Sequence, residues 1–532
     1  MAESKELGPF CRAAAKFWSG TARPAGDDVV LVELMSQDLR VAIRNLTLAS
    51  ALCRTNPARM VVLTGTSKDD DPRTALAEAY GAADVVDVHG LVDALMHDAK
   101  VAPFVVAGRT VDLGAPAEPI AGDILATFVD ATAALAHKAP RLGAEERQGP
   151  RYQRIKERAQ VYSRLYDALC AGLEPAALVT SSVDYTHTGL AAESARRAGV
   201  PVVQVLSTGT LQARALFPPA GDGTFRAELT HRLGAAFDEH VWPHRAELHR
   251  RADHTAWTNA LGRGRPASWR GGGEVSLLEF RNPAEREAVR RHAMARYGFD
   301  PAKPVVTVYV PDLTGALHGT VEAFEEPATW LKEMAELALA RTDVNWLFVD
   351  HPEQGAPDYF AEVAAKHPGP RYVRSMDLSK NVLFALTDLG LTTRGAIAAE
   401  LPAYGIPALQ AGWSEWSELG ISTVAADENG YWRTLRDTLD ALVAGKALLT
   451  DDQVAKARLW MWFHRVATDV PTMLVQHWEL GDGDELLGTL KTTFQYAEPD
   501  ADPLFEAVRR MWTRREPFLT RYDLAEGPEG IA

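Results

Sequence analysis

Cysteine and long apolar segments are both scarce in this sequence. Its 532 residues include three cysteines, Cys11, Cys53 and Cys170, which stand too far apart for a disulfide framework or a compact set of thiolate metal ligands. No run of about eighteen apolar residues is present to cross a bilayer. The first residues lack the cationic start and apolar core of a secretory signal. We therefore expect a cytoplasmic protein.

Positive charge is also in short supply. The chain has 56 lysines and arginines against 71 aspartates and glutamates, which gives a formal net charge of −15. This balance argues against a general nucleic-acid binder, although a local basic patch could still hold an anionic ligand. No acidic pair of the Asp-x-Asp kind follows a predicted strand, so we expect neither a metal nor another cofactor.

Strand and helix patterns alternate along two parts of the chain. Apolar segments predict strands near 29–32, 60–63, 85–88, 177–182 and 202–206, and again near 305–310, 346–350, 371–374, 389–391 and 408–411. The helical segments between them are typical of parallel sheets covered by helices on both faces. Residues 215–303 are rich in Gly, Pro, Arg and His, and interrupt the pattern. We interpret them as a junction between two α/β lobes with a cleft between them.

The most informative segment is 388–420. Its strand ends in a turn, and a helix that ends at Gly405 follows. The residues of the turn are Thr392, Thr393, Arg394 and Gly395. The unpaired amides and positive dipole end of a helix favour anions. The turn glycine allows close approach of the backbone, and the arginine adds donors. The turn therefore predicts phosphate binding, with an ordinary strand-to-helix connection as the alternative.

A second strand end carries a histidine. His351, Pro352 and Glu353 follow the predicted strand at 346–350, and the proline keeps His351 extended. An imidazole at this place could donate a hydrogen bond to a leaving phosphate, or offset its charge as a cation. The alternative is a histidine that only caps a loop. Two such strand ends predict a nucleotide at the carboxyl edge of a parallel sheet.

Further polar residues follow other predicted strands. Asp184 and His187 follow the strand at 177–182, and either could take the proton of an attacking hydroxyl; an Asx-turn that caps the next helix is the alternative. Asp312 is a rival base, and His318 is a possible phosphate or acceptor contact. The candidate ligands for sugar hydroxyls, with plain loop polarity as the alternative, are Ser414, Glu415 and Ser417.

Several segments together resemble a known family. They are VYVPDLTGALHG (308–319), WLKEMAELALARTDVNWLFVDHPE (330–353), TTRGAIAAELPAYGIPALQAG (392–412), WSELGIST (416–423) and SSVDYTHTGLAAESARRAGVPVVQV (181–205). This combination resembles bacterial capsule and surface-polysaccharide biosynthesis proteins of the GT-B glycosyltransferase type, a group with enzymes that use CMP-activated acidic sugars such as Kdo. The resemblance covers 300–440 well and 177–206 partly.

The resemblance implies two Rossmann-like lobes with C-terminal helices packing across them. We expect an acceptor-side lobe at 1–290, a nucleotide-sugar lobe at 291–470 and a helical extension at 471–532. Glu400, on the helix after the turn, would accept hydrogen bonds from the ribose hydroxyls, as the resemblance also implies. Its alternative is a solvated helix residue, which the apolar neighbours Ala398, Ala399 and Leu401 disfavour.

The expected function is metal-independent transfer of a sugar from a nucleotide-activated donor to a surface glycan or a lipid-linked acceptor. A CMP-linked acidic sugar is favoured as donor, and a UDP-sugar comes second. A nucleotide-sugar 2-epimerase or a polyol-phosphate transferase on the same fold is an alternative. Asp350 and Ala396 replace the lysine and the serine or threonine of the family pattern, which keeps a catalytically silent binding protein open.

The carboxyl-terminal segment 511–522 mixes basic and aromatic residues. Such a segment could rest on an anionic membrane surface near a lipid-linked acceptor. We therefore add a peripheral contact with the inner membrane to the expected cytoplasmic location. Packing on the protein's own surface is the alternative.

Overall fold

The computed structural model describes residues 5–20, 26–65, 71–97, 102–114, 119–219, 221, 223–258, 281–314, 322–477 and 483–531. The chain divides into two compact units. Unit 1 comprises Met1–Thr132, Glu145–Leu229 and Ala467–Asp523, and unit 2 comprises Ala133–Ala144, Thr230–Val466 and Leu524–Ala532. The expected domain boundaries near 290 and 470 stay predictions.

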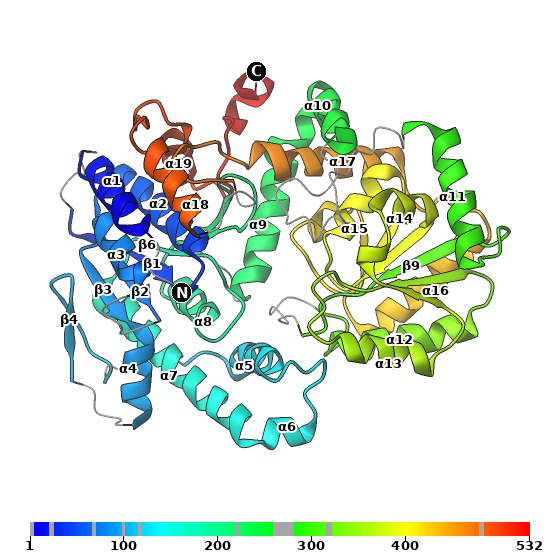
Figure 1. Ribbon diagram of the computed structural model, residues 1–532, viewed down its shortest axis with the longest axis horizontal. Coiled ribbons are helices and arrows are strands. Elements are labelled where there is room, and N and C mark those ends of the chain that lie inside the picture. Colours follow the sequence, from blue (N-terminus) through cyan, green and yellow to red (C-terminus); the bar gives the residue numbers. More distant parts are fainter. Residues whose placement is uncertain are drawn as a thin grey trace. The chain divides into compact units, whose positions relative to one another are not determined.

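Unit 1 is built on a six-stranded sheet in the order β3-β2-β1-β6-β7-β8. Figure 1 labels four of these strands, β3, β2, β1 and β6. The strands are β1 (Asp28–Leu34), β2 (Ala58–Thr64), β3 (Asp84–Asp87), β6 (Ala177–Thr180), β7 (Val202–Val205) and β8 (Ala213–Leu216). All pairs are parallel except β7 with β8. The strand order reverses direction between β1 and β6, which marks the switch point where open parallel sheets bind ligands.

One helix of unit 1, α2 (Leu39–Thr55), is buried on all sides along most of its length. Every residue of α2 from 41 to 53 is buried. The helix lies against β1 and also contacts the C-terminal helix α19 (Pro503–Arg514). Its buried polar residues have partners inside the protein: the Arg44 guanidinium donates to the Gly209 carbonyl at 2.6 Å, and Asn45 Nδ2 donates to the Glu33 carbonyl at 2.8 Å. The remaining helices are α1 (Leu7–Gly20), α3 (Pro72–Ala79), α4 (Val88–His97), α5 (Gly122–His137), α6 (Ala144–Gln148), α7 (Pro150–Leu173), α8 (Gly189–Arg197) and α18 (Gly483–Thr493); β4 (Phe104–Val106) and β5 (Arg109–Val111) form a hairpin.

Unit 2 has a second six-stranded sheet, in the order β11-β10-β9-β12-β13-β14, and all its pairs are parallel. Its strands are β9 (Val305–Tyr309), β10 (Asn345–Val349), β11 (Arg371–Val373), β12 (Leu389–Thr392), β13 (Ala408–Gln410) and β14 (Thr423–Val424). The central strand reads VVTVY because a strand covered on both faces needs apolar, β-branched residues. The switch point lies between β9 and β12.

Helices cover both faces of this second sheet. The helices α12 (Pro327–Ala340), α13 (Pro357–Lys366) and α16 (Glu428–Val443) share one core cluster with the strands. In that cluster Trp330 Nε1 donates to the Tyr431 hydroxyl at 2.9 Å, which satisfies two buried polar groups. The other helices are α10 (Arg245–Thr258), α11 (Pro283–Tyr297), α14 (Lys380–Leu386), α15 (Ile397–Glu400) and α17 (Asp451–Trp462). The helix α9 (Phe225–His240) begins in unit 1 and continues into unit 2 from Thr230.

The expected class of two Rossmann-like α/β units is confirmed, with one local difference. The helix after β12 ends at Gly405 as expected, but its α-helical part covers only Ile397–Glu400 and a 3₁₀ turn, Leu401–Tyr404, completes it. Pro402 explains the change because it has no N–H to continue the α-helical ladder. Separately, none of the helices in the described ranges is long and apolar enough to span a membrane.

Candidate functional site

The loops that leave β9, β10, β12 and β13 meet at the carboxyl edge of the unit 2 sheet, because these strands are parallel neighbours. They carry predicted site residues: Asp312, His351, Pro352, Thr393, Arg394, Gly395, Ser414, Glu415 and Ser417, with Thr392 as the last residue of β12. His318 lies outside the described residues. The structure thus brings most of the predicted nucleotide-side residues to one sheet edge.

A buried carboxylate holds the loop that carries His351. Asp350 Oδ1 accepts hydrogen bonds from the His351 amide at 2.8 Å and from Gln354 Nε2 at 2.9 Å. Gln354 also accepts from the Leu313 amide at 2.9 Å and donates to the Pro311 carbonyl at 3.0 Å. Burial raises the pKa of Asp350, against the lowering effect of these hydrogen bonds. Through Gln354, Asp350 therefore joins the loops that follow β9 and β10.

The hydrogen bonding of His351 sets its tautomer. The Glu353 amide donates to His351 Nδ1 at 3.1 Å. Because Nδ1 accepts this bond, the proton of the neutral ring lies on Nε2. Burial lowers the pKa of His351, and the nearby Asp312 carboxylate only partly opposes that shift. A neutral imidazole that offers Nε2–H as a donor is therefore favoured over a cation near pH 7.

Asp312 has a local structural role. Its Oδ1 accepts from the Thr314 amide at 3.1 Å, the Thr314 hydroxyl at 3.0 Å and the Gly355 amide at 3.0 Å. These bonds form an Asx-type turn after β9 and tie it to the loop after β10. The role of Asp312 as a base stays a prediction, with one of its oxygens already engaged in three hydrogen bonds.

The turn after β12 is compact. The Gly395 amide donates to Thr392 Oγ1 at 3.3 Å, and a Cβ at Gly395 would approach that oxygen to 2.9 Å. Thr392 and Thr393 are buried. Arg394 Nε forms an ion pair with Glu322 at 3.0 Å, so the guanidinium is positioned rather than left to move in solvent. One helical turn follows and has a small dipole, so phosphate binding here depends on the turn and its side chains.

The loop after β13 packs onto the β12 turn. Ser414 Oγ donates to the Arg394 carbonyl at 3.1 Å, and Ser417 Oγ accepts from the Ser414 amide at 2.8 Å. Glu415 lies 3.6 Å from His464, which follows α17. Sugar binding by the two serines and Glu415 stays a prediction, and their hydrogen bonds also give them a role in shaping the loop.

Glu400 is buried between two cations. The residue is 1% exposed. Its carboxylate lies 2.7 Å from Lys380 Nζ and 2.8 Å from Arg465 Nη2. Lys380 begins α14 and Arg465 lies in the π-helical turn Phe463–Ala467 after α17. Neither partner was predicted from the sequence. Glu400 thus fixes two cations that come from separate elements of unit 2. The predicted contact with ribose hydroxyls stays a prediction.

A third group of predicted residues lies at the edge of the unit 1 sheet. Asp184 Oδ1 accepts two hydrogen bonds from Arg226, one of them from Nε at 2.7 Å. His187 stacks on Tyr185 with a centroid separation of 6.1 Å, and its ring lies 6.4 Å from that of His89. Burial lowers the pKa of His187 and of His89. Two neutral imidazoles therefore lie close together here, and only one was predicted.

A buried glutamate joins the two strands at the unit 1 switch point. Glu33, 1% exposed, accepts from the Met35 amide at 2.5 Å, the Ser181 amide at 3.1 Å, the Ser181 hydroxyl at 2.9 Å and the Thr180 hydroxyl at 3.2 Å. A buried charge requires partners of this kind. A glutamate inside the apolar run VVLVEL was the available sequence signal.

The basic and aromatic C-terminal segment packs on unit 1. The Ala215 amide donates to the Pro517 carbonyl at 3.0 Å and the Leu519 amide to the Ala213 carbonyl at 2.9 Å, so this segment lies beside β8. Met511, Phe518 and Leu519 are buried. Contact with a membrane stays a prediction.

No group of three or more His, Cys, Asp or Glu side chains within the described ranges is placed to hold a metal ion.

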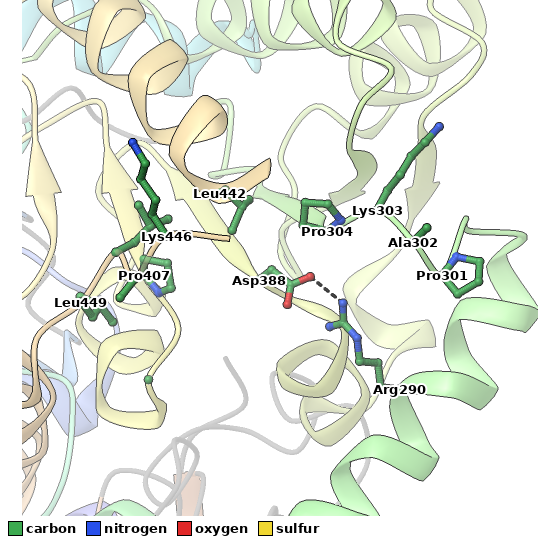
Figure 2. A pocket seen from close by; sticks show the side chains of 13 residues that line it. Arg290, Pro301, Ala302, Lys303, Pro304, Asp388, Pro407, Leu442, Lys446 and Leu449 are labelled. Carbon is green, nitrogen blue, oxygen red and sulfur yellow. Dashed lines mark hydrogen bonds and ion pairs between the residues drawn. The ribbon is translucent and has the colours of Figure 1, made fainter. Parts of the chain in front are cut away.

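A cavity of 470 Å³ lies at the opposite, amino edge of the unit 2 sheet (Figure 2). Figure 2 shows the Arg290 guanidinium directed at the Asp388 carboxylate, 2.6 Å away. Asp388 also accepts from the Val305 amide at 2.7 Å, and Arg290 donates to the Leu386 carbonyl at 2.8 Å. These groups join the starts of β9 and β12, so we assign them a structural role.

No family model and no curated protein matches this sequence. Solved structures similar to the chain include UDP-GlcNAc 2-epimerase from Neisseria meningitidis bound to UDP-GlcNAc (12% identity, 81% of this chain and 97% of that chain, TM-score 0.24). Others are S. aureus MnaA with UDP (11%, 81% and 94%, 0.25) and the wall teichoic acid polymerase TagF (10%, 92% and 94%, 0.25). These values are too low to support an argument about activity.

Proposed function

We propose that the chain is a metal-independent glycosyltransferase that moves a sugar from a nucleotide-activated donor to an acceptor hydroxyl. The supporting observation is the edge of the unit 2 sheet, where a neutral imidazole donor and several cations surround the switch point. A CMP-linked acidic sugar is the favoured donor and a UDP-sugar the second. The acceptor, a surface glycan or lipid-linked hydroxyl, is assigned to the edge of unit 1.

The donor side must stabilise a leaving phosphate. When the acceptor oxygen attacks the anomeric carbon, the bond from that carbon to the phosphate oxygen breaks and the electron pair leaves with the phosphate. Nε2–H of His351 would donate to this oxygen, and Arg394, Lys380 and Arg465 would offset its charge. Fixed donors and cations are effective here because they need no reorganisation during the reaction.

The acceptor side must remove the hydroxyl proton. Asp184 is the first candidate and His187 the second. The lowered pKa of His187 keeps the imidazole neutral at pH 7, which supports its use as a proton acceptor. Asp184 is held by Arg226, and this pair orients the carboxylate. The proton would pass to one of these groups as the new glycosidic bond forms.

Replacement of His351 tests the proposal. His351→Ala should lower turnover about 10²–10⁴-fold, as expected for loss of a positioned proton or hydrogen-bond donor. Far-UV circular dichroism should be unchanged, because the side chain is not part of the apolar core. His367→Ala, at the end of α13, is the matched control and should retain full turnover. Unchanged turnover of His351→Ala would remove the assignment.

Two other functions use the same sheet edges. The paired neutral imidazoles His89 and His187 favour acid–base chemistry on the sugar itself, which a nucleotide-sugar 2-epimerase requires. Incubation with UDP-GlcNAc alone separates the cases, since an epimerase turns over without an acceptor. A polyol-phosphate transferase would instead require a CDP-polyol donor. A silent binding protein would show nucleotide-dependent thermal stabilisation without any turnover.

A further inference from the structure

A second cavity in unit 2, of 390 Å³, has an unusual concentration of arginines. It lies between α10 and α17, which are extensively packed together. Its charged lining residues are Arg245, Arg250 and Asp253 of α10, Arg281 before α11, and Arg458 of α17. Four guanidinium groups thus share one cavity with one carboxylate, in a chain whose formal net charge is −15.

The single carboxylate organises two of the arginines. Asp253 lies 2.7 Å from Arg281 and 3.1 Å from Arg458. Both guanidinium groups also lie near the ring of Trp257, with centroid distances of 5.9 Å and 5.6 Å. Arg458 Nε donates to the Ala403 carbonyl at 2.8 Å, which anchors it to the 3₁₀ turn after α15. Asp253 therefore offsets part of the charge of Arg281 and Arg458.

The other two arginines have no carboxylate partner within the described part of the chain. The Arg245 guanidinium lies 4.9 Å from the centroid of the Trp242 ring and donates to the Trp242 carbonyl at 3.3 Å. Arg250 has neither an ion pair nor a side-chain hydrogen bond among those residues, and it is exposed. The cavity therefore keeps a positive excess that solvent or a bound anion must balance.

We propose that this cavity binds a small anion with a diphosphate group. Guanidinium groups bind phosphate oxygens in a bidentate manner, and several of them suit two adjoining phosphates better than one monoanion. The volume falls in the usual range for small-molecule sites. Inorganic pyrophosphate and the diphosphate of a nucleotide share this chemistry. The proposal does not depend on the proposed transferase activity, because it involves none of the sheet-edge residues.

Titration calorimetry on the full chain tests the proposal, with inorganic pyrophosphate and cytidine diphosphate as separate probes. Loss of a charge-assisted bidentate contact should raise the dissociation constant about tenfold or more in Arg250→Gln and in Arg245→Gln. Arg251→Gln is the matched control, since it removes the same charge from an exposed position of α10 that does not line the cavity. All three variants should unfold at the wild-type temperature.

The two probes also identify the source of the diphosphate. Binding of either probe that depends on Arg245 and Arg250 but not on Arg251 supports the site, and the tighter probe names the natural class. Binding that Arg394→Gln abolishes and Arg250→Gln leaves unchanged would place the anion at the sheet edge and overturn the proposal. Absence of binding by both probes at millimolar concentration would overturn it as well.

Discussion

The two sheets of this protein share one strand order, yet their carboxyl edges carry different chemistry. In unit 1 the imidazoles of His89 and His187 lie edge to face, and burial lowers the pKa of both, which favours their neutral forms. Glu33 joins β1 to β6 through hydrogen bonds to neutral groups. In unit 2 the same region is organised by ion pairs, including the two that Glu400 makes with Lys380 and Arg465.

This difference shows that the position of a ligand site and the kind of ligand that it binds have separate causes. The strand order alone places ligand-binding loops at each switch point, because parallel neighbours end at one edge. The side chains then determine what can bind, which is why one fold serves many functions. The unit 1 edge has neutral imidazoles and aromatic rings beside the Asp184–Arg226 pair, which suits a hydroxylic acceptor. The unit 2 edge has cations that carboxylates hold in place, and such cations suit a phosphate. This division supports the proposed roles of the two units.

Removing the central carboxylate of unit 2 should have the largest effect. Glu400→Ala leaves Lys380 and Arg465 close together and mostly buried without their shared counter-charge. Loss of one partner of a buried ion pair costs about 3–5 kcal/mol. Chemical denaturation should therefore show a lower free energy of unfolding by about that amount.

A surface pair supplies the control for Glu400→Ala. Glu336 lies 3.4 Å from Lys332 on α12, and both side chains are about half exposed. Exposed pairs of this kind contribute roughly 0–1 kcal/mol. If Glu400→Ala proved as mild as Glu336→Ala, the buried network would not distinguish unit 2 from unit 1.

The corresponding change in unit 1 should be smaller. Glu33→Gln keeps the size of the side chain but replaces one acceptor oxygen with an NH₂ group. The Ser181 amide is one of the donors that need an acceptor here, and unlike a hydroxyl it cannot become an acceptor itself. One unsatisfied buried donor costs about 1–3 kcal/mol. Denaturation should report a loss in this range, and the exposed Glu78→Gln on α3 should show none. A loss as large as that of Glu400→Ala would mean that the two edges depend equally on charge.

The sequence predicted the strands and the sheet edges well, for a physical reason. Strands such as VVTVY are β-branched and apolar because both faces of a parallel sheet are covered. The partners of Glu400 were not predictable, because Lys380 and Arg465 lie far from it along the chain and no periodicity connects them. Val88 was assigned to a strand but begins α4, and the seven-residue helix α14 was missed since its pattern is too short to separate from a loop.

The smallest expected effect concerns Asp350, and its sign depends on pH. Burial raises the folded-state pKa of Asp350 above its unfolded value, so ionisation of this carboxyl disfavours the folded state as pH rises through the folded pKa. Asp350→Asn retains an oxygen that accepts from the His351 amide and from Gln354. The variant should therefore be slightly more stable than the parent at pH 7, and the difference should disappear at a pH below the ordinary pKa of an aspartate, where the Asp350 carboxyl is protonated in both states.

Denaturation curves at these two pH values give the free energy of unfolding of the variant and of the parent. The comparison separates the effect of the Asp350 charge from that of its hydrogen bonds, and the exposed Asp358→Asn on α13 is the control. If Asp350→Asn is instead less stable at pH 7, the negative charge itself contributes to the fold. In that case the attraction of a nearby cation outweighs the cost of burying the Asp350 charge. Arg374 is the candidate cation, because its charge already acts to lower the pKa of Asp350. The unit 2 edge would then depend on charge at β10 as well as at Glu400, which would sharpen its contrast with unit 1.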